Sequence, residues 1–75
     1  MEAVTISLTQ VNQVQKFVNV VSKVPYDVDM VSGRYTINAK SLLGIYSLDL
    51  NRPLQVVMYS DDCEALKKEL EEFMR

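Results

Sequence analysis

The chain of 75 residues contains no histidine and no tryptophan, and it has only one cysteine, two glycines and two prolines. Without histidine, the chain cannot form a Ser-His or Cys-His catalytic pair or a histidine-ligated metal site. The lone cysteine, Cys63, excludes an internal disulfide and fits a reducing compartment. Two glycines are too few for the usual phosphate-binding loop. We therefore expect no enzymatic activity, no metal and no cofactor.

Long apolar runs and clustered positive charge are also missing. No run approaches the ~18 residues that a membrane-spanning helix needs, and residues 1–4 lack the basic segment and apolar stretch of a signal peptide. Eight basic and ten acidic side chains give a formal net charge of −2, and the basic ones are scattered. Nucleic acids and membrane surfaces require a clustered positive face. We predict a cytoplasmic protein that binds neither.

The apolar residues change period along the chain, and the changes predict seven elements. Val4, Ile6 and Leu8 alternate with polar residues, as in a half-buried strand, whereas the apolar residues from Gln10 to Lys23 recur at helical spacing. The predicted elements, in chain order, are a strand at 4–8, a helix at 10–23, a hairpin at 26–38 around a turn at Gly33, a short helix at 42–48, a strand at 54–59 and a helix at 60–73.

The order of these elements is β-α-β-β-α-β-α. No linker, repeat or low-complexity segment divides the chain, so residues 1–75 form one domain. Helices placed between antiparallel strands can all pack on one face of the sheet. The predicted fold class is α+β, an open-faced two-layer sandwich with a four-stranded antiparallel sheet and three helices on one face.

Two possible sites have simpler interpretations. Cys63 falls on the apolar stripe of the last helix, where a free thiol behaves as a small buried hydrophobe. Asp27 and Asp29 share one face of a predicted strand. A hard cation takes six or more oxygen ligands, so a solvated strand face explains two carboxylates better than a metal site does.

One segment is more specific than the rest, Ile37-Asn38-Ala39-Lys40-Ser41-Leu42-Leu43-Gly44-Ile45-Tyr46-Ser47-Leu48. It resembles the regulatory-serine segment of HPr, the histidine-containing phosphocarrier of the bacterial sugar phosphotransferase system. The element order derived above is also the order of that family. The resemblance covers essentially the whole chain and implies an HPr-like fold.

The chain departs from the family at the start of the first helix. HPr proteins carry a Gly-hydrophobic-His-Ala-Arg-Pro motif there, and its histidine accepts and donates phosphate. Counting back from Ser41 without a gap puts Gln10 at the histidine position and Val11, Asn12 and Gln13 at the next three. Gln10 has no titratable nitrogen nucleophile, and Asn12 lacks the positive fork that arginine offers to phosphate. The resemblance thus implies a divergent member that is not a phosphocarrier; otherwise Gln10 is simply a solvated residue.

The segment around Ser41 retains more of the family pattern. In the low-GC Gram-positive branch, the matching serine is phosphorylated by a dedicated kinase, and the product is a corepressor of a catabolite-control transcription factor. A paralogue in that branch also has glutamine in place of the histidine. The resemblance implies that Ser41 is a regulatory phosphoacceptor and that HPr kinase/phosphorylase or a transcription regulator is the partner. It also implies partner-binding roles for four neighbours, Lys40, Leu42, Leu43 and Tyr46.

Two readings of the function follow. In the first, the chain is a regulatory, protein-binding module of the phosphotransferase system that acts through Ser41 and the adjacent apolar patch, without a small-molecule substrate. In the second, it is an interaction or structural protein that has left that pathway. Ser41 then only caps a short helix, and Val57 and Tyr59, on the outward face of their strand, are candidate contacts.

Overall fold

The computed structural model describes residues 1–74. It contains four strands and three α-helices, followed by one turn of 3-10 helix. The elements are β1 (Glu2–Ile6), α1 (Val11–Val21), β2 (Val28–Ser32), β3 (Tyr35–Asn38), α2 (Leu42–Tyr46), β4 (Leu54–Met58), α3 (Glu64–Leu70) and the 3-10 turn Glu71–Phe73. The predicted order of elements is confirmed.

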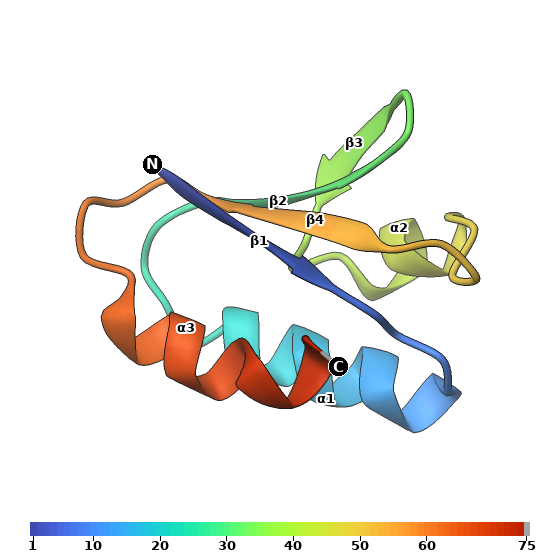
Figure 1. The fold of residues 1–75 in the computed structure, drawn as a ribbon, viewed down its shortest axis with the longest axis horizontal. Coiled ribbons are helices and arrows are strands. Elements are labelled where there is room, and N and C mark those ends of the chain that lie inside the picture. The colour runs from blue at the N-terminus through green and yellow to red at the C-terminus, as the bar shows by residue number, and fades with distance from the viewer. Residues whose placement is uncertain (75) are drawn as a thin grey trace.

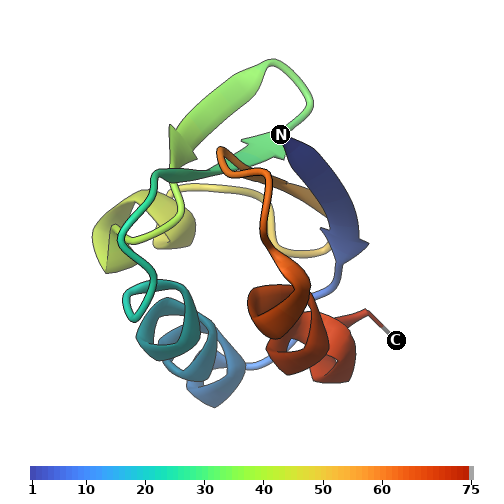
Figure 2. The same cartoon turned by 90° about the vertical axis from the view of Figure 1, so that its left-hand side faces the viewer.

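The four strands form one antiparallel sheet in the order β1-β4-β2-β3. α1 and α3 run beneath the sheet, and the view along them shows α2 on the same side (Figures 1 and 2). β3 forms the edge farthest from β1, and it rises away from the helices. The structure is therefore the predicted two-layer α+β sandwich, with one sheet face left without a helix.

The core lies between the sheet and the helices. Phe17 of α1 and Phe73 meet edge to face with their ring centroids 5.8 Å apart, a favourable arrangement of two aromatic side chains. Cys63 is buried, as predicted. Val11, which continues the predicted apolar stripe of α1, is instead 70% exposed because it occupies the first position of the helix, beyond the end of the core.

Element ends differ from the prediction by a few residues. α1 ends at Val21 rather than Lys23, because the amides of Lys23 and Val24 donate to carbonyls three residues back and close a tighter turn before Pro25. Gly33 has φ +58°, the positive value predicted for this tight turn. No helix within residues 1–74 has the length and apolar character needed to cross a membrane.

Candidate functional site

Ser41 is the N-cap of α2. Its backbone is extended, and its Oγ accepts a hydrogen bond from the Gly44 N–H at 3.2 Å. The entry into the helix is fixed by Asn38, whose Oδ1 accepts from the Lys40 N–H at 2.9 Å while its carbonyl accepts from the Ser41 N–H at 3.0 Å. This local turn holds the Ser41 hydroxyl, which is half-buried, at a defined position.

Gly44 comes close to this hydroxyl from inside the helix. A Cβ at residue 44 would lie 3.2 Å from Ser41 Oγ and 3.3 Å from Ile37 Cδ1, tighter than ordinary van der Waals contact. Glycine in a helix normally lowers stability relative to alanine. Its presence here leaves open the space beside the Ser41 hydroxyl.

Lys40 is directed toward the protein. Its Nζ donates to the carbonyls of Val24 and Tyr26 at 2.9 and 2.8 Å, and the side chain is partly buried. These two bonds tie the segment before α2 to the segment before β2. In this structure the ammonium therefore stabilises the loop that presents Ser41.

The three apolar residues expected to form a docking patch divide into two groups. Leu42 is partly buried and packs against the core. Leu43 is 82% exposed and Tyr46 is 41% exposed. We call the pair Leu43 and Tyr46 the α2 surface. Contiguous patches of exposed apolar side chains mark interaction sites, whereas single exposed apolar residues are normal on a protein surface.

Gln10 is the N-cap residue of α1, with an extended backbone. The first turn is held chiefly by Gln13, whose Oε1 accepts from the Thr9 N–H at 2.8 Å, the Thr9 hydroxyl at 3.0 Å and the Gln10 N–H at 3.2 Å. Asn12 is exposed. No hydrogen bond joins this turn to the Ser41 segment among residues 1–74.

The helix-free face of the sheet carries a polar group at the ends of β2 and β4. The Tyr59 hydroxyl donates to Asp29 Oδ2 at 3.0 Å, and this bond raises the pKa of Tyr59 above its ordinary value. Asp27, Asn38 and these two residues line a shallow hollow of about 340 Å³. Within residues 1–74, no group of three or more acidic, cysteine or histidine side chains is arranged to hold a metal ion.

Sequence reasoning missed a second hollow, of about 610 Å³, between the β2–β3 turn and the loop from α2 to β4. Its lining contains both arginines of the middle of the chain, Arg34 and Arg52. One signal was available: β2 buries alternate residues, Val28, Met30 and Ser32, so a serine occupies a core-facing position.

The fold and the order of its elements define an HPr-like domain, which is the fold of a class of phosphocarriers rather than of a classical enzyme. The chain is similar to HPr-C-His from Thermoanaerobacter tengcongensis, with a TM-score of 0.82 and 26% sequence identity over 99% of this chain and 91% of that one. It also shares the fold of the phosphocarrier protein HPr from Bacillus anthracis strain Ames, with a TM-score of 0.74 and 23% identity over 99% of this chain and 94% of that one. No protein-family model and no curated protein matches the sequence.

Proposed function

We propose that this protein is a regulatory, protein-binding module controlled by phosphorylation of Ser41, and that it does not carry phosphate on a histidine. The observation that carries the proposal is the arrangement at α2, where a hydroxyl at the helix start adjoins the exposed side chains of the α2 surface. A kinase would transfer the γ-phosphoryl group of ATP to Ser41 Oγ, with ADP as the leaving product and the hydroxyl proton passing to the kinase.

Phosphorylation would change the electrostatics of this surface strongly. A phosphoserine adds about −1.5 to −2 charges at neutral pH, so the formal net charge would change from −2 to about −4. Because α2 has only five residues, few peptide dipoles are aligned, and direct donation from N–H groups of the first turn would be the main local stabilisation. In this proposal Lys40 holds the loop in place, and Leu43 and Tyr46 contact the partner.

The start of α1 supports the second half of the proposal. The chain has no histidine, and neither Gln10 nor Asn12 supplies a nucleophilic nitrogen or a guanidinium group. In addition, the Gln13 side chain already accepts hydrogen bonds at this turn, from Thr9 and Gln10. We infer that Gln10 occupies the position of the phosphocarrier histidine and that phosphoryl transfer at this position has been lost.

Incubation of the full chain with an HPr kinase/phosphorylase and ATP, followed by intact-mass measurement, tests the proposal. We expect a mass increase of one phosphate group in the native chain and none in Ser41→Ala. Ser47→Ala is the matched control, since this exposed serine follows α2 directly and should leave labelling unchanged. An unmodified native chain, under conditions that label a genuine HPr, would contradict the kinase switch.

One observation favours the alternative, an HPr-fold interaction protein in which Ser41 is only a cap. The Ser41 hydroxyl already accepts a bond from Gly44, which is the ordinary role of a serine at a helix start. In that case Val57 and Tyr59 on the helix-free sheet face are the candidate contacts. Chemical-shift mapping of this chain on addition of a binding partner separates the two functions. The proposal expects shift changes at Leu43 and Tyr46, and the alternative expects them at Val57 and Tyr59.

A further inference from the structure

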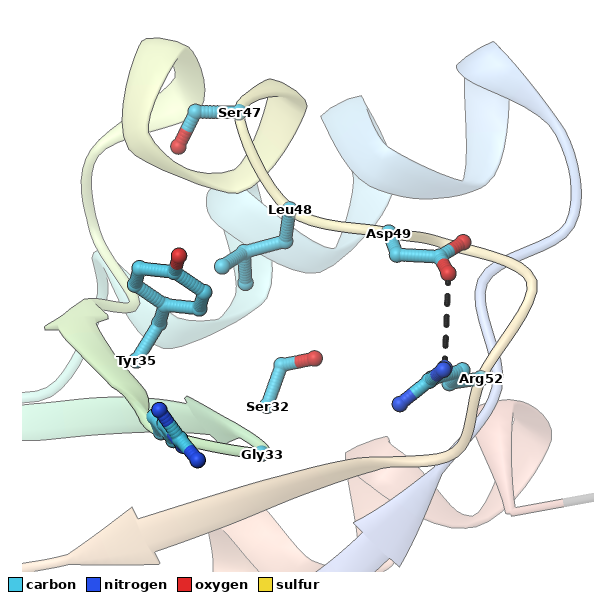
Figure 3. Close-up of a pocket in the computed structure, with 8 residues that line it drawn as sticks. Ser32, Gly33, Tyr35, Ser47, Leu48, Asp49 and Arg52 are labelled. Carbon is cyan, nitrogen blue, oxygen red and sulfur yellow. Dashed lines mark ion pairs between the residues drawn. The ribbon is translucent and has the colours of Figure 1, made fainter.

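The hollow between the β2–β3 turn and the loop after α2 combines positive charge, a buried hydroxyl and an exposed ring. Eight residues line it, and Figure 3 shows Tyr35 and Leu48 on one side of Ser32, with Arg52 and Asp49 on the other. The volume of about 610 Å³ falls within the roughly 300–1,000 Å³ of small-molecule sites. The hollow is thus large enough for a small ligand.

Ser32 is the polar centre of the hollow. It is 8% exposed, and it is the one polar residue among the three buried residues of β2, Val28, Met30 and Ser32. Its hydroxyl has no hydrogen-bond partner within residues 1–74. Every side-chain oxygen or nitrogen of these residues that is fully enclosed does have a partner, so the Ser32 hydroxyl is not fully enclosed. The hydroxyl therefore opens into the hollow. Because buried polar groups are nearly always hydrogen-bonded, this hydroxyl is available to water or to a ligand.

Tyr35 is the cross-strand partner of Ser32, so both side chains lie on the same face of the hairpin. The core has ended at this point, which leaves the Tyr35 ring 70% exposed. Leu48, half-buried, lies beside it. A ring and an aliphatic side chain beside a polar group fit a ligand with an organic part as well as a charged part.

Arg52 is positioned by the loop that contains it. Asp49 Oδ1 accepts from the Asn51 N–H at 3.0 Å, and Asp49 Oδ2 lies 3.4 Å from Arg52 Nε. The carboxylate thus fixes the turn and orients the guanidinium from one side. Arg34, at the hairpin turn, makes no ion pair within residues 1–74. Two guanidinium groups against one carboxylate make the hollow locally positive on a chain of net charge −2.

We propose that this hollow binds a small phosphate monoester. The phosphate contacts the guanidinium groups of Arg34 and Arg52 and the Ser32 hydroxyl, and the organic part contacts Tyr35 and Leu48. Guanidinium groups present planar, paired N–H donors that match phosphate oxygens. This site is independent of Ser41 and of the kinase proposed above.

Titration of the ¹⁵N-labelled full chain at constant ionic strength tests the site. The probes are phenyl phosphate, inorganic phosphate and phenol, which separate the complete ligand from its charged part and from its ring. We expect saturable shifts at residues 32–35 and 47–52 with phenyl phosphate, weaker binding of inorganic phosphate, and no saturable shift with phenol. Absence of saturation with phenyl phosphate, or equal shifts around scattered lysines, would overturn the proposal.

Substitutions identify the binding groups. Arg34→Gln and Arg52→Gln should each weaken phenyl phosphate binding about tenfold, as expected for loss of a hydrogen bond to a charged group. Lys16→Gln removes the same charge from an exposed position of α1 and should leave binding unchanged. Ser32→Ala removes the buried hydroxyl that contacts the phosphate in this proposal, and it should also weaken phenyl phosphate binding. Equal weakening by the Lys16 and arginine variants would mean nonspecific attraction and would also overturn the site.

Discussion

The two helix starts that the sequence singled out are stabilised in different ways. α1 has eleven residues, begins after Gln10, and is closed by the Gln13 side chain reaching back to Thr9 and Gln10. α2 has five residues and is capped by the hydroxyl of Ser41. At the start of the long helix, backbone N–H groups therefore donate to the side-chain amide oxygen of Gln13. At the start of the short helix, a backbone N–H group donates to the hydroxyl oxygen of Ser41.

This difference shows how one HPr-like fold can present two helix starts with different chemical capacity. The amide oxygen of Gln13 accepts hydrogen bonds but cannot receive a phosphoryl group and release it as a carrier does. A serine hydroxyl can cap a helix and can also be phosphorylated. We therefore expect α1 to depend on its core face and α2 to depend on its first turn. The predictions below test that contrast.

The largest effect is expected for Phe17→Ala. If α1 is held mainly by its core face, removal of the ring that contacts Phe73 should lower the free energy of unfolding by about 3–5 kcal/mol. Urea denaturation followed by circular dichroism measures this. Gln15→Ala, at an exposed position of the same helix, is the control. A loss below that of Gln13→Ala would contradict packing as the main support of α1.

A second prediction compares the two first turns directly. Ser41→Ala should lower the free energy of unfolding by about 0.5–2 kcal/mol, whereas Ser41→Asp should keep stability near that of the native chain because aspartate caps as well as serine. Gln13→Ala should cost about 0.5–1.5 kcal/mol for its lost hydrogen bonds. Thermal unfolding of the three variants is the measurement. An unchanged stability of Ser41→Ala would show that the cap is unimportant at α2.

The order of elements was predictable because it depends on local periodicity. The alternation of Val4 and Ile6 and the helical spacing of Val14 and Phe17 each match one burial pattern. Element ends were less predictable. The stop at Val21 depends on two hydrogen bonds that form only when the chain turns toward Pro25.

The sequence could single out a segment whose residues are contiguous, but it could not predict an arrangement that depends on distant segments meeting. Ser41 and its neighbours are contiguous in the sequence. The direction of Lys40 toward the carbonyls of Val24 and Tyr26 depends on contacts across 16 and 14 residues. The hollow around Ser32 and Arg52 likewise requires the hairpin turn and the loop after α2 to lie side by side.

A third prediction separates the cap from the switch at Gly44. Gly44→Ala gains helix propensity worth about 1 kcal/mol, but its methyl group lies 3.2 Å from Ser41 Oγ and 3.3 Å from Ile37. We expect these effects to offset each other in thermal stability, while phosphorylation of Ser41 by HPr kinase/phosphorylase slows because the space beside the hydroxyl is filled. The initial rate of Ser41 phosphorylation, measured by intact mass, tests this. Ala65→Gly, which makes the reverse substitution on α3, is the control for the effect of helix propensity on stability. Unchanged labelling would contradict a role for the Gly44 space.

The smallest effect concerns pH and lies outside both helix starts. Lys67 of α3 donates to Glu2 of β1 at 2.6 Å, and this bond lowers the pKa of Glu2 below its ordinary value. A lowered pKa in the folded state stabilises the protein above the unfolded pKa of about 4.3, and the stabilisation is lost as the pH falls through the folded pKa. Both side chains remain about one-third exposed, so the effect is small.

Glu2→Gln should therefore flatten the decline of thermal stability on the acid side, measured between about pH 3 and 7, where the glutamate titrates. Glu72→Gln is the matched control, because Glu72 is exposed and makes no ion pair within residues 1–74. The caps of Ser41 and Gln13 contain no group that titrates in this range, so Ser41→Ala and Gln13→Ala should lower stability by the same amount throughout it. A contradictory result would be a loss for Ser41→Ala that varies with pH across this range, together with no effect of Glu2→Gln. The acid dependence of stability would then arise at the start of α2 and not at the Glu2–Lys67 pair, and the Ser41 cap could not be treated as neutral.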